Sequence, residues 1–261
     1  MSEACLGVVL RTTPLRESDL LVTLYTDAHG RVSAVARGAR RSQRRFSGAL
    51  SLLVLGRYQL DRPRGDLWTL GGAEIVREWM RLSSDVIAVA HASYVAELVG
   101  ALLPPESPEP LALELIIALW DSLADAGPSP GALRAIELAL LDLAGHRPAI
   151  ERCAACGGDE LESGAVFDPA RGGAICRSCA AQSRAPGVRP FEPMTRAYLA
   201  AIEALESPAA ARVLDTDARF TPADRHAARD ASLAMVTGLV GRPLRSLEYL
   251  AKLVVAGRRE G

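Results

Sequence analysis

The chain has 261 residues, of which 49% are apolar and 23% are charged, and its formal net charge is −1. This composition excludes an intrinsically disordered chain, and the length suits one large domain or two to three small ones. No stretch approaches 18 consecutive apolar residues, and Met1-Ser2-Glu3 does not open a basic and then apolar leader. We therefore expect a cytoplasmic protein without a membrane span.

The near-zero net charge is a cancellation between segments of opposite sign. Residues 1–81 hold thirteen arginines against eight acidic residues, a balance of +5, whereas residues 82–150 hold two against nine, a balance of −7. No acidic residue occurs between Asp27 and Asp61, and a dense cluster of arginines there creates a positive field whatever the total charge is. The arginines of this stretch are Arg31, Arg37, Arg40, Arg41, Arg44, Arg45 and Arg57.

The first 80 residues predict a small β-barrel. Apolar or β-branched runs alternate with turn residues such as Pro14, Gly30, Gly38 and Gly65. Five short strands in about 75 residues suit a closed barrel of the OB type, although strand spacing alone does not separate it from an SH3-like barrel. The expected strands are Leu6–Thr13, Leu20–Thr26, Arg31–Arg37, Leu50–Leu60 and Leu67–Val76.

From Ser83 onward the apolar residues follow a helical period. Ser129 and Thr221 are expected N-caps, because each precedes a proline that suits the first turn of a helix. The expected helices are Asp85–Leu103, Pro110–Ala126, Gly131–Ala144, Met194–Leu205, Ala223–Val240 and Leu244–Val255.

Four cysteines are spaced as the ligands of a metal ion. Cys153 and Cys156 form one CxxC pair, Cys176 and Cys179 form a second, and 19 residues separate the pairs. This spacing is typical of a zinc ribbon, in which a hairpin joins two tight turns that each place two thiolates on one metal. Structural disulfides are the alternative, but they require an oxidising compartment. Four thiolates close the coordination shell, so we expect a structural rather than a catalytic Zn²⁺.

The arginine cluster favours an anionic partner. Residues 37–45 follow a predicted strand and are expected to form a mobile surface loop, whose guanidinium groups can each donate two hydrogen bonds to a phosphate. A solvated loop is the alternative, but its self-repulsion favours nucleic-acid contact. Aromatic residues of the same region can stack bases in an OB-type site, although core packing is the favoured interpretation for each. These aromatic residues are Tyr25, Phe46, Tyr58, Trp68 and Trp79.

Several short motifs occur in one order along nearly the whole chain. The N-terminal ones include Glu17-Ser-Asp19 and His29-Gly30-Arg31, and the middle of the chain carries Glu137-Leu-Ala-Leu-Leu141 before the first CxxC pair. Gly172-Gly173 precedes the second CxxC pair, and Gly241-Arg-Pro-Leu-Arg-Ser246 lies near the C-terminus. Together these motifs resemble those of the RecO family of bacterial recombination mediators. The chain departs from the family at Ile136, where an aromatic residue is common, and we interpret this as a change in packing.

The resemblance implies an α+β, multidomain protein: an N-terminal OB-fold β-barrel followed by an all-α domain with an inserted zinc module of four cysteines. The expected OB-fold domain is residues 1–80, and the zinc module is residues 151–185. The helical domain is expected in two parts, residues 81–150 and 186–261. It also implies a non-enzymatic, nucleoid-associated protein that binds and anneals single- and double-stranded DNA, contacts the C-terminal tail of single-stranded DNA-binding protein (SSB) and works with RecR to load RecA. On this hypothesis the seven arginines named above contact DNA, and the ligands of a structural Zn²⁺ are Cys153, Cys156, Cys176 and Cys179.

Two alternatives from other functional classes stay open at this point. OB barrels and zinc ribbons also occur in RNA-binding accessory factors of transcription or translation. A metal nuclease is a weaker alternative, because it rests on Glu74 and Glu78, two carboxylates near a strand end of a kind that is usually solvated. Lys252 is the only lysine and has no Gly-Lys-Ser/Thr context, which excludes a Walker-type phosphate loop.

Overall fold

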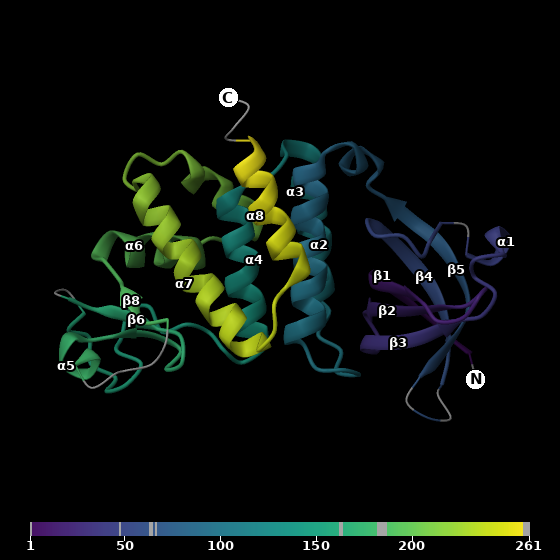
Figure 1. The fold of residues 1–261 in the computed structure, drawn as a ribbon, viewed down its shortest axis with the longest axis horizontal. Coiled ribbons are helices and arrows are strands. Elements are labelled where there is room, and N and C mark those ends of the chain that lie inside the picture. The colour runs from purple at the N-terminus through teal and green to yellow at the C-terminus, as the bar shows by residue number, and fades with distance from the viewer. Residues whose placement is uncertain are drawn as a thin grey trace. The chain divides into compact units, whose positions relative to one another are not determined.

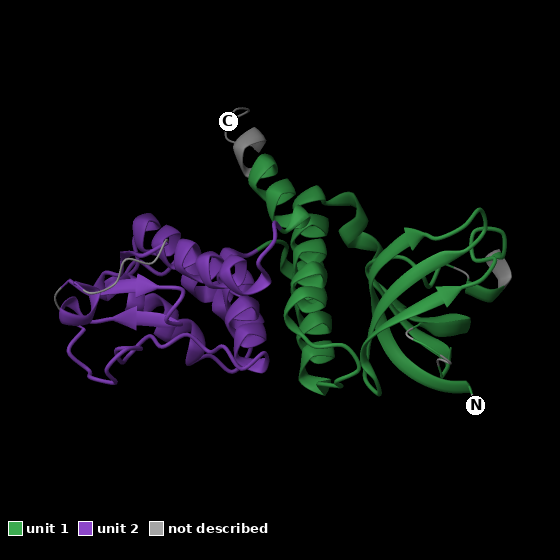
Figure 2. Ribbon diagram, turned by 60° about the horizontal axis from the view of Figure 1, so that its bottom comes forward, with its two compact units in different colours: residues 1–128, 244–261 green, residues 129–243 purple. Residues whose placement is uncertain are grey.

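The computed structural model describes residues 2–46, 48–62, 65, 67–161, 164–181 and 187–257, and it shows an N-terminal barrel and a set of helices (Figure 1). The chain divides into two compact units (Figure 2). Unit 1 contains residues 1–128 and 244–261, and unit 2 contains residues 129–243. The mixed α+β class is confirmed, while the boundaries of the four expected domains stay predictions.

Five strands of unit 1 close into a barrel with the strand order β1-β2-β3-β5-β4. All neighbours are antiparallel except β3 and β5, which pair in parallel between Ala34 and Trp68 and between Val35 and Thr69. This order confirms the OB-type barrel over the SH3-like alternative. The strands are β1 (Ser2–Pro14), β2 (Leu20–Thr26), β3 (Gly30–Ala36), β4 (Val54–Asp61) and β5 (Trp68–Glu78).

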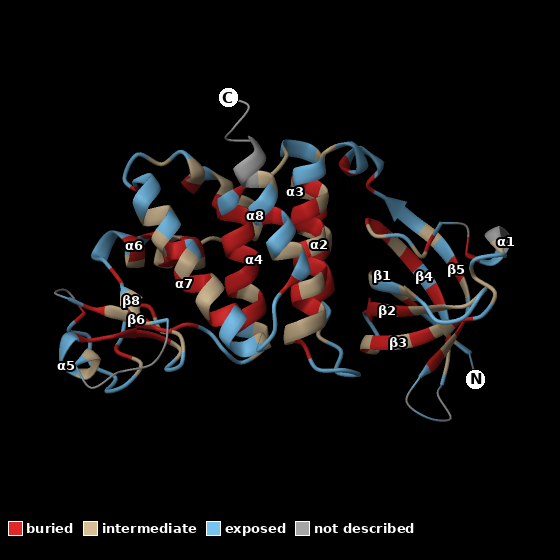
Figure 3. Cartoon of the chain, in the orientation of Figure 1, coloured by how far each residue is buried: buried red, intermediate tan, exposed pale blue. Residues whose placement is uncertain are grey.

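The barrel core follows from the two-residue period of its strands. In β3, Val32, Ala34 and Ala36 are buried, whereas the residues between them are half-buried (Figure 3). At Gly7, β1 lies between two partners, because this residue pairs with Thr26 of β2 and with Gly56 of β4. A Cβ atom at Gly7 would lie 2.5 Å from a backbone oxygen of β2, so only glycine permits this close approach.

The connection between β3 and β4 differs from the expected one. Gln43–Phe46 forms a short helix, α1, in place of an irregular loop. The expected strand over Leu50–Leu60 begins only at Val54, because turns occupy the residues before it and Leu53 has a positive φ of 66°. The apolar residues of this connection pack into the barrel instead of extending a strand, since Phe46 and Ala49 belong to the barrel core.

Unit 1 also contains η1 (Met80–Ser84), α2 (Val86–Leu102), α3 (Pro110–Ala126) and α8 (Arg245–Gly257). The bounds of α3 agree with the expected ones, since Pro110 starts the helix and Gly127 ends it with a φ of 74°. Glu97 of α2 accepts hydrogen bonds from the backbone N–H groups of Arg245 (3.2 Å) and Ser246 (2.9 Å), and so caps the first turn of α8.

The segment between α2 and α3, residues 103–109, is attached to the barrel, and we call it the strap. Glu106 donates its backbone N–H to the carbonyl of Arg31 (3.0 Å) and accepts a hydrogen bond from the indole of Trp68 (2.9 Å). The Tyr25 hydroxyl bonds to the backbone of Glu109 (3.1 Å). Gly30 is required here, because its φ is 61° and a Cβ atom would lie 2.3 Å from the carbonyl of Ser107.

A second attachment joins the C-terminal half of α3 to the end of β5. Asp121 accepts hydrogen bonds from the guanidinium of Arg77 (3.1 Å to one oxygen) and from the indole of Trp79 (2.8 Å). Trp79 packs edge-on against Trp120, with ring centroids 5.1 Å apart. Therefore α3 is held to the barrel at two separate places, at its N-terminus and at Asp121.

Unit 2 packs helices around α4 and adds a small three-stranded sheet of order β7-β6-β8. Ser129 caps α4 and Thr221 caps α7 in a capping box, as the sequence predicts. A buried ion pair joins Arg134 and Glu137, and the Ser232 hydroxyl donates to the same carboxylate. The elements are α4 (Pro130–Leu143), β6 (Val166–Asp168), β7 (Gly173–Ile175), α5 (Arg177–Ala180), β8 (Arg189–Pro190), α6 (Pro193–Glu203), η2 (Pro208–Asp215) and α7 (Pro222–Val240).

No helix in the described part of the chain is long and apolar enough to cross a membrane.

Candidate nucleic-acid interface and metal centre

The arginine loop, residues 37–45, leaves the barrel where β3 ends. Turns occupy its first residues and α1 its last ones. Arg37, Arg40, Arg41 and Arg45 are exposed, and the side chain of Arg44 lies outside the part that the structure describes. Arg45 folds back over the loop: it donates to the carbonyl of Arg37, and its guanidinium carbon lies 5.2 Å from the ring centroid of Phe46.

The arginine loop is hydrogen-bonded to the β1–β2 loop, residues 15–19. Asp19 accepts a hydrogen bond from the backbone N–H of Gly38 (2.8 Å), and the backbone N–H of Arg40 donates to the carbonyl of Ser18 (3.1 Å). The Arg40 guanidinium donates to the carbonyl of Glu17 (3.2 Å), and Arg41 pairs with the Glu17 carboxylate (2.5 Å). The two loops therefore form one surface, which we call the loop pair.

Two carboxylates of the loop pair differ in their surroundings. The Glu17 side chain is 87% exposed, and its partner Arg41 is 68% exposed, so water screens their attraction. Asp19 is half-buried, and the N–H of Gly38 lowers its pKa, with further help from the Ser18 hydroxyl and from Arg16 and Arg37. Asp19 is thus held ionised at the start of the arginine loop.

Arg31 and Arg57 lie apart from the loop pair. Arg31 lies at the N-terminal end of β3, whereas Arg37 follows its C-terminal end, and the Nε of Arg31 donates to the carbonyl of Leu103 in the strap (3.1 Å). Arg57 is exposed on β4 and lies opposite Glu74 of β5 in the strand register. Of the arginines predicted to contact DNA, the structure therefore gathers Arg37, Arg40, Arg41 and Arg45 on one surface and places Arg31 and Arg57 elsewhere.

The aromatic candidates for base stacking lie in the protein interior. Each is at most 5% exposed, so core packing is the interpretation that the structure bears out. Tyr58 donates its hydroxyl to the carbonyl of Ala49 (2.8 Å), and burial raises the pKa of that hydroxyl. This set comprises Tyr25, Phe46, Tyr58, Trp68 and Trp79.

The four cysteines of the CxxC pairs come together in unit 2. Their sulfur atoms all lie within 4.8 Å of one another, and the Sγ atoms of Cys156 and Cys176 are 4.0 Å apart. A tetrahedral Zn²⁺ with bonds of about 2.3 Å separates its sulfur ligands by about 3.8 Å, so the cluster can hold such an ion after a small contraction. All cysteines are free thiols, and the hairpin of β6 and β7 joins the two pairs as expected.

Backbone N–H groups favour the thiolate of Cys153, whereas the Cys176 side chain, burial and the other thiols raise the pKa of Cys179. Burial opposes ionisation of Cys153, but N–H groups of Cys176, Cys156 and Ala155 outweigh it and lower its pKa to about 6. The Cys176 N–H lies 3.3 Å from the Cys153 sulfur. Gly157 adopts the φ of 75° that the first turn requires. A divalent cation fits this donor set, because it replaces the protons that four adjacent thiols otherwise share.

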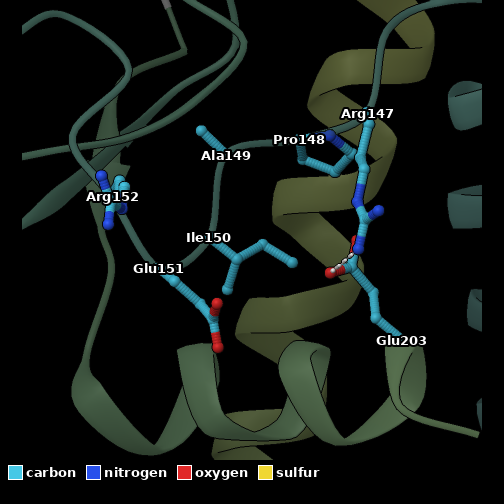
Figure 4. Close-up of a pocket in the computed structure, with 7 residues that line it drawn as sticks. All are labelled: Arg147, Pro148, Ala149, Ile150, Glu151, Arg152 and Glu203. Atoms are coloured by element: carbon cyan, nitrogen blue, oxygen red, sulfur yellow. Dashed lines mark hydrogen bonds and ion pairs between the residues drawn. The ribbon is translucent and has the colours of Figure 1, made fainter. Parts of the chain in front are cut away.

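The segment that leads from α4 into the metal module forms one wall of a cavity of about 300 Å³ (Figure 4). Arg147 and Glu203 form an ion pair of 3.2 Å at this cavity, and the carboxylate raises the pKa of Arg147. Ala149 exchanges backbone hydrogen bonds with the strand that precedes Cys176, accepting from Ala174 and donating to Gly172. The bonds of Ala149 attach the hairpin that leads to Cys176 to the segment that follows α4.

Comparison with known proteins assigns the family. Residues 1–79 match the family model described as Recombination protein O N terminal, and residues 83–248 match Recombination protein O C terminal. A DNA repair protein RecO from Anaeromyxobacter sp. (strain K) is 38% identical over 95% of each chain. The chain belongs to the RecO family. A RecO from Myxococcus xanthus is 32% identical over 95% of this chain and 96% of its own length, and one from Geobacter sulfurreducens is 39% identical over 67% and 72%.

The RecO assignment confirms the resemblance in the sequence and places the protein in DNA repair and recombination. Ile136 is fully buried, so its side chain packs in the core of unit 2. The family names are those of DNA repair proteins and indicate no enzymatic activity.

Inspection of the sequence alone missed Glu17 and Asp19 as parts of the site, although both lie in a RecO motif. Charges counted along the sequence show no acidic residue between Asp27 and Asp61, but they do not show which acidic residues lie beside the arginine loop in the fold. The expected strands Leu20–Thr26 and Arg31–Arg37 carried a signal, because they are separated by a short turn: if they pair, the residues before the first strand meet those after the second, and the observed register pairs Leu20 with Ala36.

Proposed function

We propose that this RecO-family protein binds single- and double-stranded DNA through its loop pair, anneals complementary strands, and acts with RecR to load RecA onto SSB-coated DNA. The observation that carries the proposal is the exposed set of arginines at the end of a closed OB barrel. Contact with the acidic C-terminal tail of SSB, and a cytoplasmic, nucleoid-associated location, belong to the same proposal.

The proposed chemistry is charge neutralisation rather than bond making. Two DNA backbones repel each other, and arginines that bind phosphates of both strands lower that repulsion while the bases pair. Planar guanidinium groups suit this role because each can contact two oxygens of one phosphate. Arg37, Arg40, Arg41, Arg44 and Arg45 supply these contacts in the proposal, with Arg57 on the barrel wall and the Nη groups of Arg31 as outlying members.

In the same proposal the Zn²⁺ ion is structural and is held by Cys153, Cys156, Cys176 and Cys179. Four thiolates leave no position for water, so the ion supplies no catalysis. Held by these thiolates, the ion would fix the hairpin of β6 and β7 to the segment that follows α4. The proposed binding and annealing of DNA require no enzymatic step.

The test is annealing of complementary strands, bare and SSB-coated, with RecR present or absent. We expect faster annealing of bare strands, and RecA loading on SSB-coated strands only when RecR is present. Binding is measured in parallel on single-stranded DNA and on RNA of the same sequence. Failure to accelerate annealing on either substrate overturns the mediator proposal, and preference for RNA supports the accessory-factor alternative instead.

A further inference from the structure

We propose that Asp19 is a positioning residue of the nucleic-acid interface, which orders the arginine loop for phosphate, whereas its neighbour Glu17 competes with phosphate for Arg41. The inference rests on the proposed function, because it assigns opposite roles at that site to two carboxylates of one short loop.

Asp19 fixes the backbone at the start of the arginine loop. Asp19 directly precedes β2, and its carboxylate receives the N–H of Gly38 at 2.8 Å. Gly38 has a φ of 65°, and the N–H groups of Arg41 and Ser42 both donate to its carbonyl. The conformation of Gly38 therefore sets the direction of the turn that carries the arginines, and Asp19 holds Gly38 from a rigid strand end.

The second step concerns the cost of ordering this loop. Closely spaced guanidinium groups repel one another, and a free loop of this length samples many conformations. Phosphate binding would have to overcome both costs if the loop were free. The Asp19 carboxylate bonds to the backbone of the arginine loop and attracts Arg16 and Arg37. It therefore orders the loop and offsets part of the repulsion before DNA binds.

The third step separates Glu17 from Asp19. The Glu17 carboxylate contacts the Arg41 guanidinium rather than the backbone of the arginine loop, and it is almost fully exposed. The Nη2 group of Arg41 bonds to Glu17, and a phosphate that takes a two-bond contact through Nη2 competes with Glu17 for it. Electrostatics alone predicts that loss of either carboxylate strengthens DNA binding. Our proposal predicts that loss of Asp19 weakens DNA binding and that loss of Glu17 strengthens it.

The experiment compares five forms of the full-length protein on single-stranded DNA across a salt series: wild type, Asp19→Ala, Asp19→Asn, Glu17→Gln and Asp27→Ala. Asp27 is the matched control, because it lies at the far end of β2 and likewise accepts a backbone N–H, that of Leu6 at 3.0 Å. Asparagine at position 19 keeps an acceptor oxygen for Gly38 but removes the charge. Hydrogen exchange of the arginine loop is measured on each form without DNA.

We expect Asp19→Ala to raise the Kd about 3- to 10-fold, as for loss of one ordering hydrogen bond, and to speed exchange in the loop. Asp19→Asn restores protection and binds as tightly as wild type or more tightly. Glu17→Gln lowers the Kd and keeps the wild-type salt slope, because Arg41 binds phosphate in both forms but no longer has to leave a carboxylate first. Asp27→Ala leaves the loop exchange unchanged and does not weaken binding.

The proposal is overturned if Asp19→Ala binds DNA as tightly as wild type, or if its loop exchanges at the wild-type rate. Weakening by Asp27→Ala to the same extent overturns it too, because the effect would then be one of general stability. If the wild-type protein binds no DNA, the proposed function fails, while the exchange rates still decide whether Asp19 orders the loop.

Discussion

The salt dependence of DNA binding tests the loop pair most directly. We consider the triple variant in which Arg37, Arg40 and Arg41 are each replaced by Gln. All three side chains are exposed in the arginine loop, so the change removes three charges without opening the barrel core. The matched control replaces Arg171, Arg219 and Arg229, three exposed arginines of unit 2 that pair with nearby aspartates.

The expected magnitude follows from counterion release. Each phosphate contact on a single strand contributes about −0.7 to the slope of log affinity against log salt concentration, so loss of three contacts flattens the slope by about 2. If five loop arginines bind phosphate, raising salt from about 50 to 200 mM weakens wild-type binding about 100-fold, but weakens the triple variant only about 7-fold.

The assay is fluorescence anisotropy with labelled single-stranded DNA at a series of salt concentrations, with thermal unfolding of both variants to show that they fold. The control variant should keep the wild-type slope although its net charge changes equally. An unchanged slope in the arginine-loop variant, or an equal loss in the control, refutes the assignment of DNA contacts to this loop.

Three further changes test the framework around the site. Cys153→Ser should release the metal and lower the free energy of unfolding by more than about 3 kcal/mol, measured by metal analysis and thermal unfolding; a metal-free wild type of undiminished stability contradicts this. Gly30→Ala should cost at least about 2 kcal/mol in denaturant unfolding, because its Cβ meets the strap at Ser107, and wild-type stability would show that the strap is not packed there. Glu137→Gln should cost about 3 kcal/mol or more, since it leaves the buried Arg134 without its counter-charge; replacing both by apolar residues should recover much of the loss.

Much of the fold was predictable because local signals decide it. Ser129 and Thr221 satisfy the first N–H groups of their helices, and the prolines after them suit only a first turn, so the starts of α4 and α7 agree with expectation to within a residue. The cysteine cluster was predictable for the same reason: CxxC spacing is a short-range constraint, and the hairpin between the pairs follows from it.

The features that were not predicted depend on contacts between residues distant in the sequence. The strap is a proline-rich stretch, and its sequence does not reveal that Glu106 bonds to Arg31 and Trp68 of the barrel. The buried pair of Arg134 and Glu137 looks, in sequence, like an exposed ion pair one turn apart on a helix. Residues 37–45 contain no acidic residue, but pairing of β2 with β3 brings Glu17 and Asp19 into contact with them, which a charge count along the chain does not show.

The two ends of β3 make different contacts, and in the proposed function their separation lets one small barrel hold its helices while it binds nucleic acid. Arg31, at the start of the strand, bonds to the strap, and the arginine loop leaves after Ala36 at its other end. Seven residues of extended chain place these ends about 20 Å apart. The strap and Asp121 hold α3 to the barrel without using any residue of the loop pair. Phosphate can therefore compete for Arg41 at one end of the strand while the helices remain attached at the other.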